Sequence, residues 1–274
     1  MLEFLAHHSK LIDQIGINAL LALSLSISLR AGSLALAQAA FMGIAAYVSS
    51  IGAVRLGWNL PLAGLAGALA AALVAALLAL PIGRLRGVFL AIATIGFGEI
   101  ARIIEINWPI TGGAEGFSGI PNDANTLWIY GTLALAGAAL ALFGRTKLAL
   151  AVAATREDEN AARGVGIDVA AVRMGTLVAG AVLAGFAGTL YAHANFFITP
   201  GDFGFSRMEQ VLVMCVIGGV TSSLGAVVGA VLMTALPELV RFLQDYREVS
   251  SGAILLGIIL FAPSGIAGLW RRFS

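Results

Sequence analysis

Charged residues are scarce in this chain of 274 residues, because Asp, Glu, Lys and Arg together make up only 11%. Soluble domains carry roughly 25% charged residues, so the chain has less than half the usual share. Seven runs contain no charge at all, and most reach the about 20 residues that a helix needs to cross a bilayer core. These runs are residues 14–29, 31–54, 56–83, 124–144, 174–201, 210–237 and 249–270. The polar stretches between them are short, which excludes a soluble domain.

Cysteine and histidine are also rare, and their scarcity excludes several kinds of site. The single Cys215 cannot form an intramolecular disulfide, and we expect it to be a small buried hydrophobe. The three histidines lack zinc-like spacing, and neither Lys10 nor Lys147 follows a glycine-rich phosphate loop. No set of nucleophile, base or metal ligand converges, so we expect neither catalysis nor a bound cofactor or metal. The formal net charge of +1 gives no indication of a nucleic-acid partner.

Residues 87–108 add an eighth apolar segment, although Glu99, Arg102 and Glu105 interrupt it. About eight such segments predict an all-α, polytopic transmembrane helical bundle, which forms a single domain over residues 1–274. The 34 glycines suit close helix contact in lipid. Two stripes of small residues at a spacing of four are predicted to be packing faces: Gly180, Ala184 and Gly188, and Gly225 with Gly229.

Lys and Arg concentrate in a few loops, which are therefore predicted to be cytoplasmic. These residues are Arg30, Arg84, Arg86, Arg145, Lys147, Arg156, Arg163, Arg173, Arg271 and Arg272. The loops of mixed charge near 202–209 and 238–248 are placed outside. This assignment is consistent only if 210–236 enters and leaves on one face, broken at the glycines of 218–225. Such backbone must be buried in protein or line a wet cavity, so 210–236 is predicted to be re-entrant, near a transport path. An ordinary long helix with tolerated glycines is the alternative.

A charged island at residues 155–168 lies between long apolar segments. Thr155 is predicted to cap a short helix in a capping box with Asp158, and Gly164 to end it. Asp168 is then expected to open the next membrane helix. The island is predicted to be a cytoplasmic helix, in a loop of about 145–173, that a soluble partner contacts. A solvated loop helix without a partner is the alternative.

Several separate motifs resemble one family of membrane proteins. Residues 87–100, 111–121 and 156–167 are similar to LivM-type permease subunits of branched-chain amino-acid ABC importers, and 183–192 and 218–229 fit as well. The resemblance covers most of the chain from about residue 31, in the same order and spacing. It implies a multi-pass protein of the bacterial inner membrane. The implied partners are a second permease subunit, two cytoplasmic ATPases that bind the ATP, and a periplasmic solute-binding protein.

The resemblance also implies that the island is a coupling helix, which docks on the ATPase and transmits its closure to the membrane helices. The residues expected to contribute to this coupling are Arg156, Glu157, Glu159, Ala161, Ala162, Arg163 and Gly166. In the outer loop of 109–126, Thr111, Gly112 and Gly113 are candidates for docking the solute-binding protein. A static loop that packs over the bundle is the alternative there.

Glu99 is a carboxylate near the middle of an apolar segment, where charge is costly and often functional. Arg102 lies three residues on, so a structural ion pair on the helix is one reading. The other reading is that Glu99 lines a translocation path together with Thr94 and Gly96. Gly218, Gly219 and Ser222, in the predicted helix break, complete the set of path candidates.

The function predicted from these features is an ATP-driven import permease for branched-chain amino acids. A close alternative keeps this machinery but carries urea or short amides. An ion-coupled secondary transporter would need polar groups gathered at mid-membrane, where only Glu99 and Arg102 qualify, and would leave the island without a purpose. A channel would need a selectivity filter or charged ring, for which the break at 218–225 is weak support.

Overall fold

The computed structural model describes residues 2–83, 85–220 and 222–239, with side chains described from residue 10 to residue 236 except 84 and 221. The segment expected at 249–270, the loop at 238–248 beyond Leu239, and Arg84, Arg271 and Arg272 lie outside the described residues. The long helices are α1 (Leu2–Arg30), α2 (Gln38–Leu56), α3 (Leu60–Ile82), α4 (Gly87–Asn107), α5 (Thr126–Phe143), α8 (Val169–Asn195), α9 (Phe205–Gly218) and α10 (Ser223–Leu239). The shorter elements are η1 (Pro109–Thr111), η2 (Gly113–Glu115), β1 (Phe117–Ser118), α6 (Lys147–Glu157), α7 (Glu159–Gly164), β2 (Phe197–Ile198) and η3 (Pro200–Phe203).

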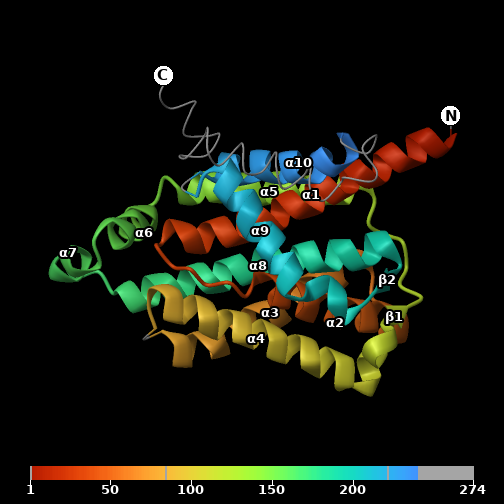
Figure 1. Cartoon of the computed structure of the whole chain (residues 1–274), viewed down its shortest axis with the longest axis horizontal. Helices are drawn as coiled ribbons and strands as arrows, with labels where there is room; N and C mark the ends of the chain where they lie inside the picture. Colours follow the sequence, from red (N-terminus) through yellow and green to blue (C-terminus); the bar gives the residue numbers. More distant parts are fainter. Residues whose placement is uncertain (1, 84, 221, 240–274) are drawn as a thin grey trace.

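The predicted polytopic helical bundle is confirmed. Six helices of the described chain, α1 to α5 and α8, are long and apolar enough to cross a membrane. The pair α9 and α10 passes the same test together but is bent by 119° at its break. Most of the long helices lie side by side along one direction, so the bundle has two ends (Figure 1). Charge-free runs therefore identified all of these spans except α4, which was predicted from its apolar residues despite three charges.

Side-chain caps set where several of these helices begin. The Asn59 side chain accepts from the Leu62 N–H at 3.2 Å to start α3, and that of Asn125 accepts from the Trp128 N–H at 3.1 Å to start α5. Asp168, predicted to open a membrane helix, accepts from the Ala170 and Ala171 N–H groups at 3.0 and 3.1 Å and starts α8. Each cap satisfies backbone donors that the first turn of a helix leaves free.

Glycines let α8 lie in the middle of the bundle. A Cβ at Gly180 would come within 2.7 Å of the Ser24 carbonyl oxygen on α1. At Gly188 it would overlap the Met42 carbonyl on α2, and Ala184 between them is fully buried. The predicted packing face of Gly180, Ala184 and Gly188 is confirmed, because only small residues allow backbones to approach so closely.

The predicted break after α9 is also confirmed. Gly219 has φ +107°, which L side chains rarely adopt, and the Ser222 hydroxyl oxygen accepts from the Gly225 N–H at 3.1 Å at the start of α10. A Cβ at Gly218 would overlap the Gly225 carbonyl, so the two helices touch at backbone level.

The hairpin returns toward the end from which it came. Arg30, the last residue of α1, donates to the Ser223 hydroxyl at 2.9 Å, and Asn18 donates to Thr234 at 2.9 Å. The helix α10 therefore runs antiparallel to α1, away from the Arg30 end. Gly229 lies against the Met214 carbonyl of α9, which confirms Gly225 and Gly229 as a packing face.

The two ends of the bundle differ in character. At one end, α6 and α7 project beyond the bundle; at the other, β1 and β2 join two loops (Figure 1). These strands pair antiparallel, with Phe117 opposite Ile198 and Ser118 opposite Phe197. Arg86, Arg163 and Arg173 converge on Glu159 at the α7 end, and Arg156 packs there against Gly32. These four of the basic residues predicted to share a side thus lie at a common end.

Candidate functional site

The charged island forms two helices, where the sequence predicted one. Thr155 is buried inside α6, where its hydroxyl donates to the Ala151 carbonyl at 2.8 Å, so the predicted cap at Thr155 is wrong. Asp158, with extended backbone (φ −154°), caps α7 by accepting from the Asn160 and Ala161 N–H groups at 2.7 and 3.1 Å. The apolar residues of 147–155 extend α6 through Thr155, and the break therefore falls at the next good cap.

The predicted end of the helix at Gly164 is confirmed, although the glycine that caps it is Gly166. Gly164 is the last helical residue of α7, and Gly166 adopts the left-handed conformation with φ +86°. The Ile167 N–H donates to the Ala162 carbonyl and the Gly166 N–H to the Arg163 carbonyl, both at 3.0 Å. This pattern is a Schellman motif, in which glycine is needed at the position after the cap.

Glu159 is the centre of an ion-pair cluster that holds α7 against the bundle. Its carboxylate lies 3.4 Å from Arg86 Nη1, before α4, and 3.8 Å from Arg163 Nη2, and it also pairs with Arg173 of α8. The Arg173 side chain is only 11% exposed. Arg86 and Arg173 were not among the predicted coupling residues, because their distance along the sequence conceals the contact. Glu159 therefore positions α7 from within the chain.

Other side chains of α6 and α7 face outward. Glu157 is 77% exposed and lies 3.6 Å from Arg156, and the Arg163 side chain is 47% exposed. Of the two alanines, Ala161 is exposed whereas Ala162 is buried. Of the predicted coupling residues, Arg156, Glu157, Ala161 and Arg163 are therefore available to a partner, Ala162 lies beneath them, and the exposed Gly166 sets the end of α7.

Thr94 has a structural partner inside the bundle. It is fully buried, its Oγ1 accepts from the Leu36 N–H at 2.8 Å, and its hydroxyl donates to the Leu90 or Ala91 carbonyl at 2.8 or 3.0 Å. Leu36 belongs to the irregular segment that precedes α2, so Thr94 satisfies a backbone donor that no helix pairs. Gly96 has open space around it.

The ion pair predicted on α4 is present. Arg102 donates from Nε to Glu99 Oε2 at 2.9 Å, and its Nη2 lies 2.9 Å from the same oxygen. Both side chains are about one-third exposed, at 34% and 36%. Among the described residues, no hydrogen bond or ion pair joins Thr94, Gly96 and Glu99 to the candidates in the α9–α10 break. A role for any of them in a translocation path stays a prediction.

The loop after α4 is tightly wound. Thr111 is buried, and its hydroxyl lies 2.6 Å from both the Glu105 and the Trp108 carbonyl oxygens. Gly112 and Gly113 have φ of +83° and +63°, and a Cβ on Gly112 would overlap the Gly116 carbonyl. The glycines are therefore required by the loop conformation, and Gly112 is exposed at its surface.

The sequence did not indicate that three polar side chains are buried without a hydrogen-bond partner among the described residues. The groups concerned are the Glu105 carboxylate, the Tyr47 hydroxyl and the Arg207 Nε and Nη2 atoms. Glu105 had been noticed only as an interruption of an apolar run. Arg102, three residues before it, bonds to Glu99, as the sequence predicted.

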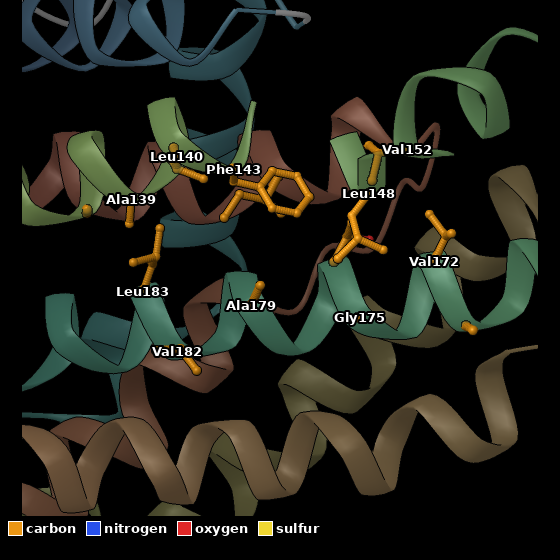
Figure 2. Close-up of a pocket in the computed structure, with 14 residues that line it drawn as sticks. Ala139, Leu140, Phe143, Leu148, Val152, Val172, Gly175, Ala179, Val182 and Leu183 are labelled. Carbon is orange, nitrogen blue, oxygen red and sulfur yellow. The ribbon is translucent and has the colours of Figure 1, made fainter. Parts of the chain in front are cut away.

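A cavity with a volume of about 640 Å³ lies between α5, α6 and α8 (Figure 2). Its labelled lining residues are apolar, and they include Leu140 and Phe143 of α5 and Val172 and Leu183 of α8. None of the lining residues carries a charge, so this cavity offers no partner to a charged or zwitterionic solute.

Comparison with known proteins identifies related permeases. The chain is 32% identical to the high-affinity branched-chain amino acid transport system permease protein LivM of Salmonella typhimurium, over 94% of this chain and 67% of that protein. It is 32% identical to LivH of the same organism over 58% of this chain and 52% of LivH. The autoinducer 2 import system permease protein LsrC of Yersinia enterocolitica is 27% identical over 62% of this chain and 51% of LsrC.

No solved structure gives a significant match to the chain. The sequence profile of one family, however, covers nearly all of the described helices. Residues 9–263 match the family described as the permease component of the branched-chain amino acid transport system, and this chain therefore belongs to that family of multi-pass membrane permeases.

Proposed function

We propose that this chain is the transmembrane permease subunit of an ATP-driven ABC importer, and that it translocates branched-chain amino acids delivered by a periplasmic binding protein. The observation that best supports this proposal is the α6–α7 element. It presents Arg156, Glu157 and Arg163 outward, while Glu159 ties it to the start of α8 and to the segment before α4. Such an element suits a partner that moves the permease from outside.

The proposed assembly contains a second permease subunit, two cytoplasmic ATPases and the binding protein, in the bacterial inner membrane. Similarity to both LivM and LivH, each named as a permease protein of a high-affinity branched-chain amino acid system, favours a pair of related permease chains. ATP is expected to bind the ATPases, and this chain to hold no cofactor. The island then lies on the cytoplasmic side, and the β1–β2 end faces the binding protein.

The identity over 94% of the chain favours branched-chain amino acids over the solute named for LsrC, which is less similar over a shorter stretch. Transport of urea or short amides by the same machinery is the closest alternative.

Reconstitution tests the energy source directly. In liposomes that contain this chain, its partner permease and the ATPases, with binding protein added outside, leucine uptake is expected to require ATP. The isolated chain is expected to accumulate no leucine under an imposed proton or sodium gradient. Gradient-driven accumulation by the chain alone would instead establish a secondary transporter. Urea uptake measured in parallel separates the substrate alternatives.

Reversing the exposed charge of α6 is expected to weaken ATPase binding. Glu157→Lys should lower co-purification of the ATPase at least fivefold, because like charges at an interface are strongly unfavourable. The thermal stability of the isolated chain should be unchanged, since Glu157 is 77% exposed and pairs only loosely with Arg156. Lys147→Glu reverses another exposed charge at the start of α6 and is the matched control. Equal ATPase recovery from the wild type and the Glu157 variant would contradict this docking surface.

A further inference from the structure

Glu105 is a buried acid whose carboxylate has no hydrogen-bond partner among the described residues. The residue is 6% exposed, and neither carboxylate oxygen accepts a hydrogen bond. An ionised carboxylate in such surroundings is strongly destabilising unless a cation or hydrogen-bond donors reach it. Packing alone does not explain it, because Gln or Leu fills a similar volume without this cost.

The nearest base does not neutralise Glu105. Arg102 lies three residues before Glu105 on α4, a spacing at which helical side chains can pair. However, Arg102 directs both Nε and Nη2 to Glu99, at 2.9 Å each. The Thr111 hydroxyl bonds to the backbone carbonyl of Glu105, which fixes the end of α4 and leaves the carboxylate free. The ion pair on α4 is thus complete without Glu105.

The space beside the Glu105 carboxylate is lined by α2 and filled by an aromatic ring. At Gly43 of α2, a Cβ would lie 2.8 Å from Glu105 Oε1 and 2.9 Å from Phe203 Cβ and Cγ. One turn further along α2 stands Tyr47, whose ring centroid is 6.0 Å from that of Phe203 and whose hydroxyl is also unpartnered. Glu105 and Tyr47 therefore both border the volume that the Phe203 ring fills.

Phe203 enters this volume from the outer loop. It is the last residue of η3, a turn of four residues that the Thr199–Asp202 capping box closes and Gly204 follows. Its ring is 2% exposed and packs edge-on against Tyr191 of α8, with centroids 5.9 Å apart. Because η3 is a short turn outside the long helices, moving Phe203 breaks no helical hydrogen-bond ladder.

The chemistry of the lining points to an amine with an apolar side chain. An ammonium group carries three donors and one positive charge, which suit an unpaired carboxylate and a hydroxyl oxygen. The apolar part of the same molecule would take the place of the Phe203 ring, between Tyr47 and Tyr191. We propose that Glu105 and Tyr47 bind the ammonium group of a hydrophobic amino acid during translocation, and that Phe203 covers this site. The identity of this substrate rests on the proposed function.

The test uses the assembled transporter of both permease chains and the ATPases. Labelled isopentylamine, which keeps the side chain and ammonium of leucine but lacks the carboxylate, is expected to bind the wild-type complex. Glu105→Gln should weaken this binding, and the rate of ATP-driven leucine uptake, by at least about tenfold, as for loss of a charge-assisted hydrogen bond. Tyr47→Phe, which removes one oxygen, should have a smaller effect in the same direction.

Two controls separate a binding role from a structural one. Glu209→Gln removes an exposed carboxylate on α9 and should change neither binding nor uptake. Isocaproate, which keeps the carboxylate and lacks the ammonium, should compete poorly with isopentylamine in the wild type. Amine binding that is unchanged in the Glu105 variant, or equal competition by isocaproate, would overturn the proposal. A wild type that binds the amine through Glu105 but transports no leucine would refute the proposed function and leave this site intact.

Discussion

Gly188→Ala is expected to prevent stable folding of the chain, although it adds a single methyl group. The new Cβ would overlap the Met42 backbone carbonyl on α2, which cannot move aside as a side chain can. Overpacking against movable side chains usually costs about 1–3 kcal/mol, and we expect a larger loss against backbone. The expected result is a loss of most monodisperse protein in detergent and a clear fall in the thermal unfolding midpoint.

Gly175→Ala on the same helix is the matched control. A Cβ there meets nothing within 4 Å, so the variant should gain roughly 0.5–1 kcal/mol of helix stability relative to glycine. Both substitutions change intrinsic helix propensity equally, and the difference between them therefore isolates the contact with α2. Similar yield and unfolding midpoint for the two variants would show that α2 and α8 do not approach as closely as described.

Glu159→Gln is expected to uncouple ATP hydrolysis from uptake. The amide cannot neutralise Arg86, Arg163 and Arg173, and these guanidinium groups then repel one another at the base of α7. Because Glu159 is 23% exposed, we expect a loss of about 1–3 kcal/mol, below the about 3–5 kcal/mol for fully buried pairs. A change of this size in the preferred position of α7 corresponds to about a 5- to 150-fold change in population.

The measurement is leucine taken up per ATP hydrolysed in proteoliposomes. The ratio is expected to fall while the ATPases still co-purify, because the outward-facing residues of α6 and α7 are unchanged. Lys147→Gln, at an exposed position without an ion pair among the described residues, should keep the wild-type ratio. An unchanged ratio for the Glu159 variant would mean that the ion-pair cluster does not hold α7 in its working position.

The sequence predicted the helical bundle well because one physical requirement dominates it. A backbone in lipid must satisfy its own hydrogen bonds, so long charge-free runs have few structures open to them. The same reasoning located the break near Gly219, where glycine permits a positive φ, and the packing face of Gly180 and Gly188. These are properties of local sequence.

The details of the charged island were less predictable. Thr155 and Asp158 are both good capping residues, and only the contacts of α6 with the bundle decide which one is used. At the other end, α7 stops at Gly164 as predicted, but Gly166 provides the left-handed cap. Local spacing could not distinguish these candidates, because their propensities are similar and tertiary packing makes the choice.

Pairing between distant residues could not be read from the sequence at all. Glu159 was placed among docking residues, although its partners include Arg86 and Arg173 from other segments. The pairing of Arg102 with Glu99 was predicted, but only the structure shows that the Glu105 carboxylate is buried without a hydrogen-bond partner among the described residues. Charge on a helix is visible in a sequence, whereas the absence of its counter-charge is not.

The helix α8 is an unbroken rod of 27 residues without proline, about 40 Å long. It begins at Asp168, just after α7, and ends beside β2, which is paired with the loop that contains Gly112 and leads into the turn that carries Phe203. We therefore expect a displacement of α7 along the axis of α8 to move the segment around β2 at the other end of the helix. A single helix therefore joins the α7 end of the bundle to the loops at the opposite end.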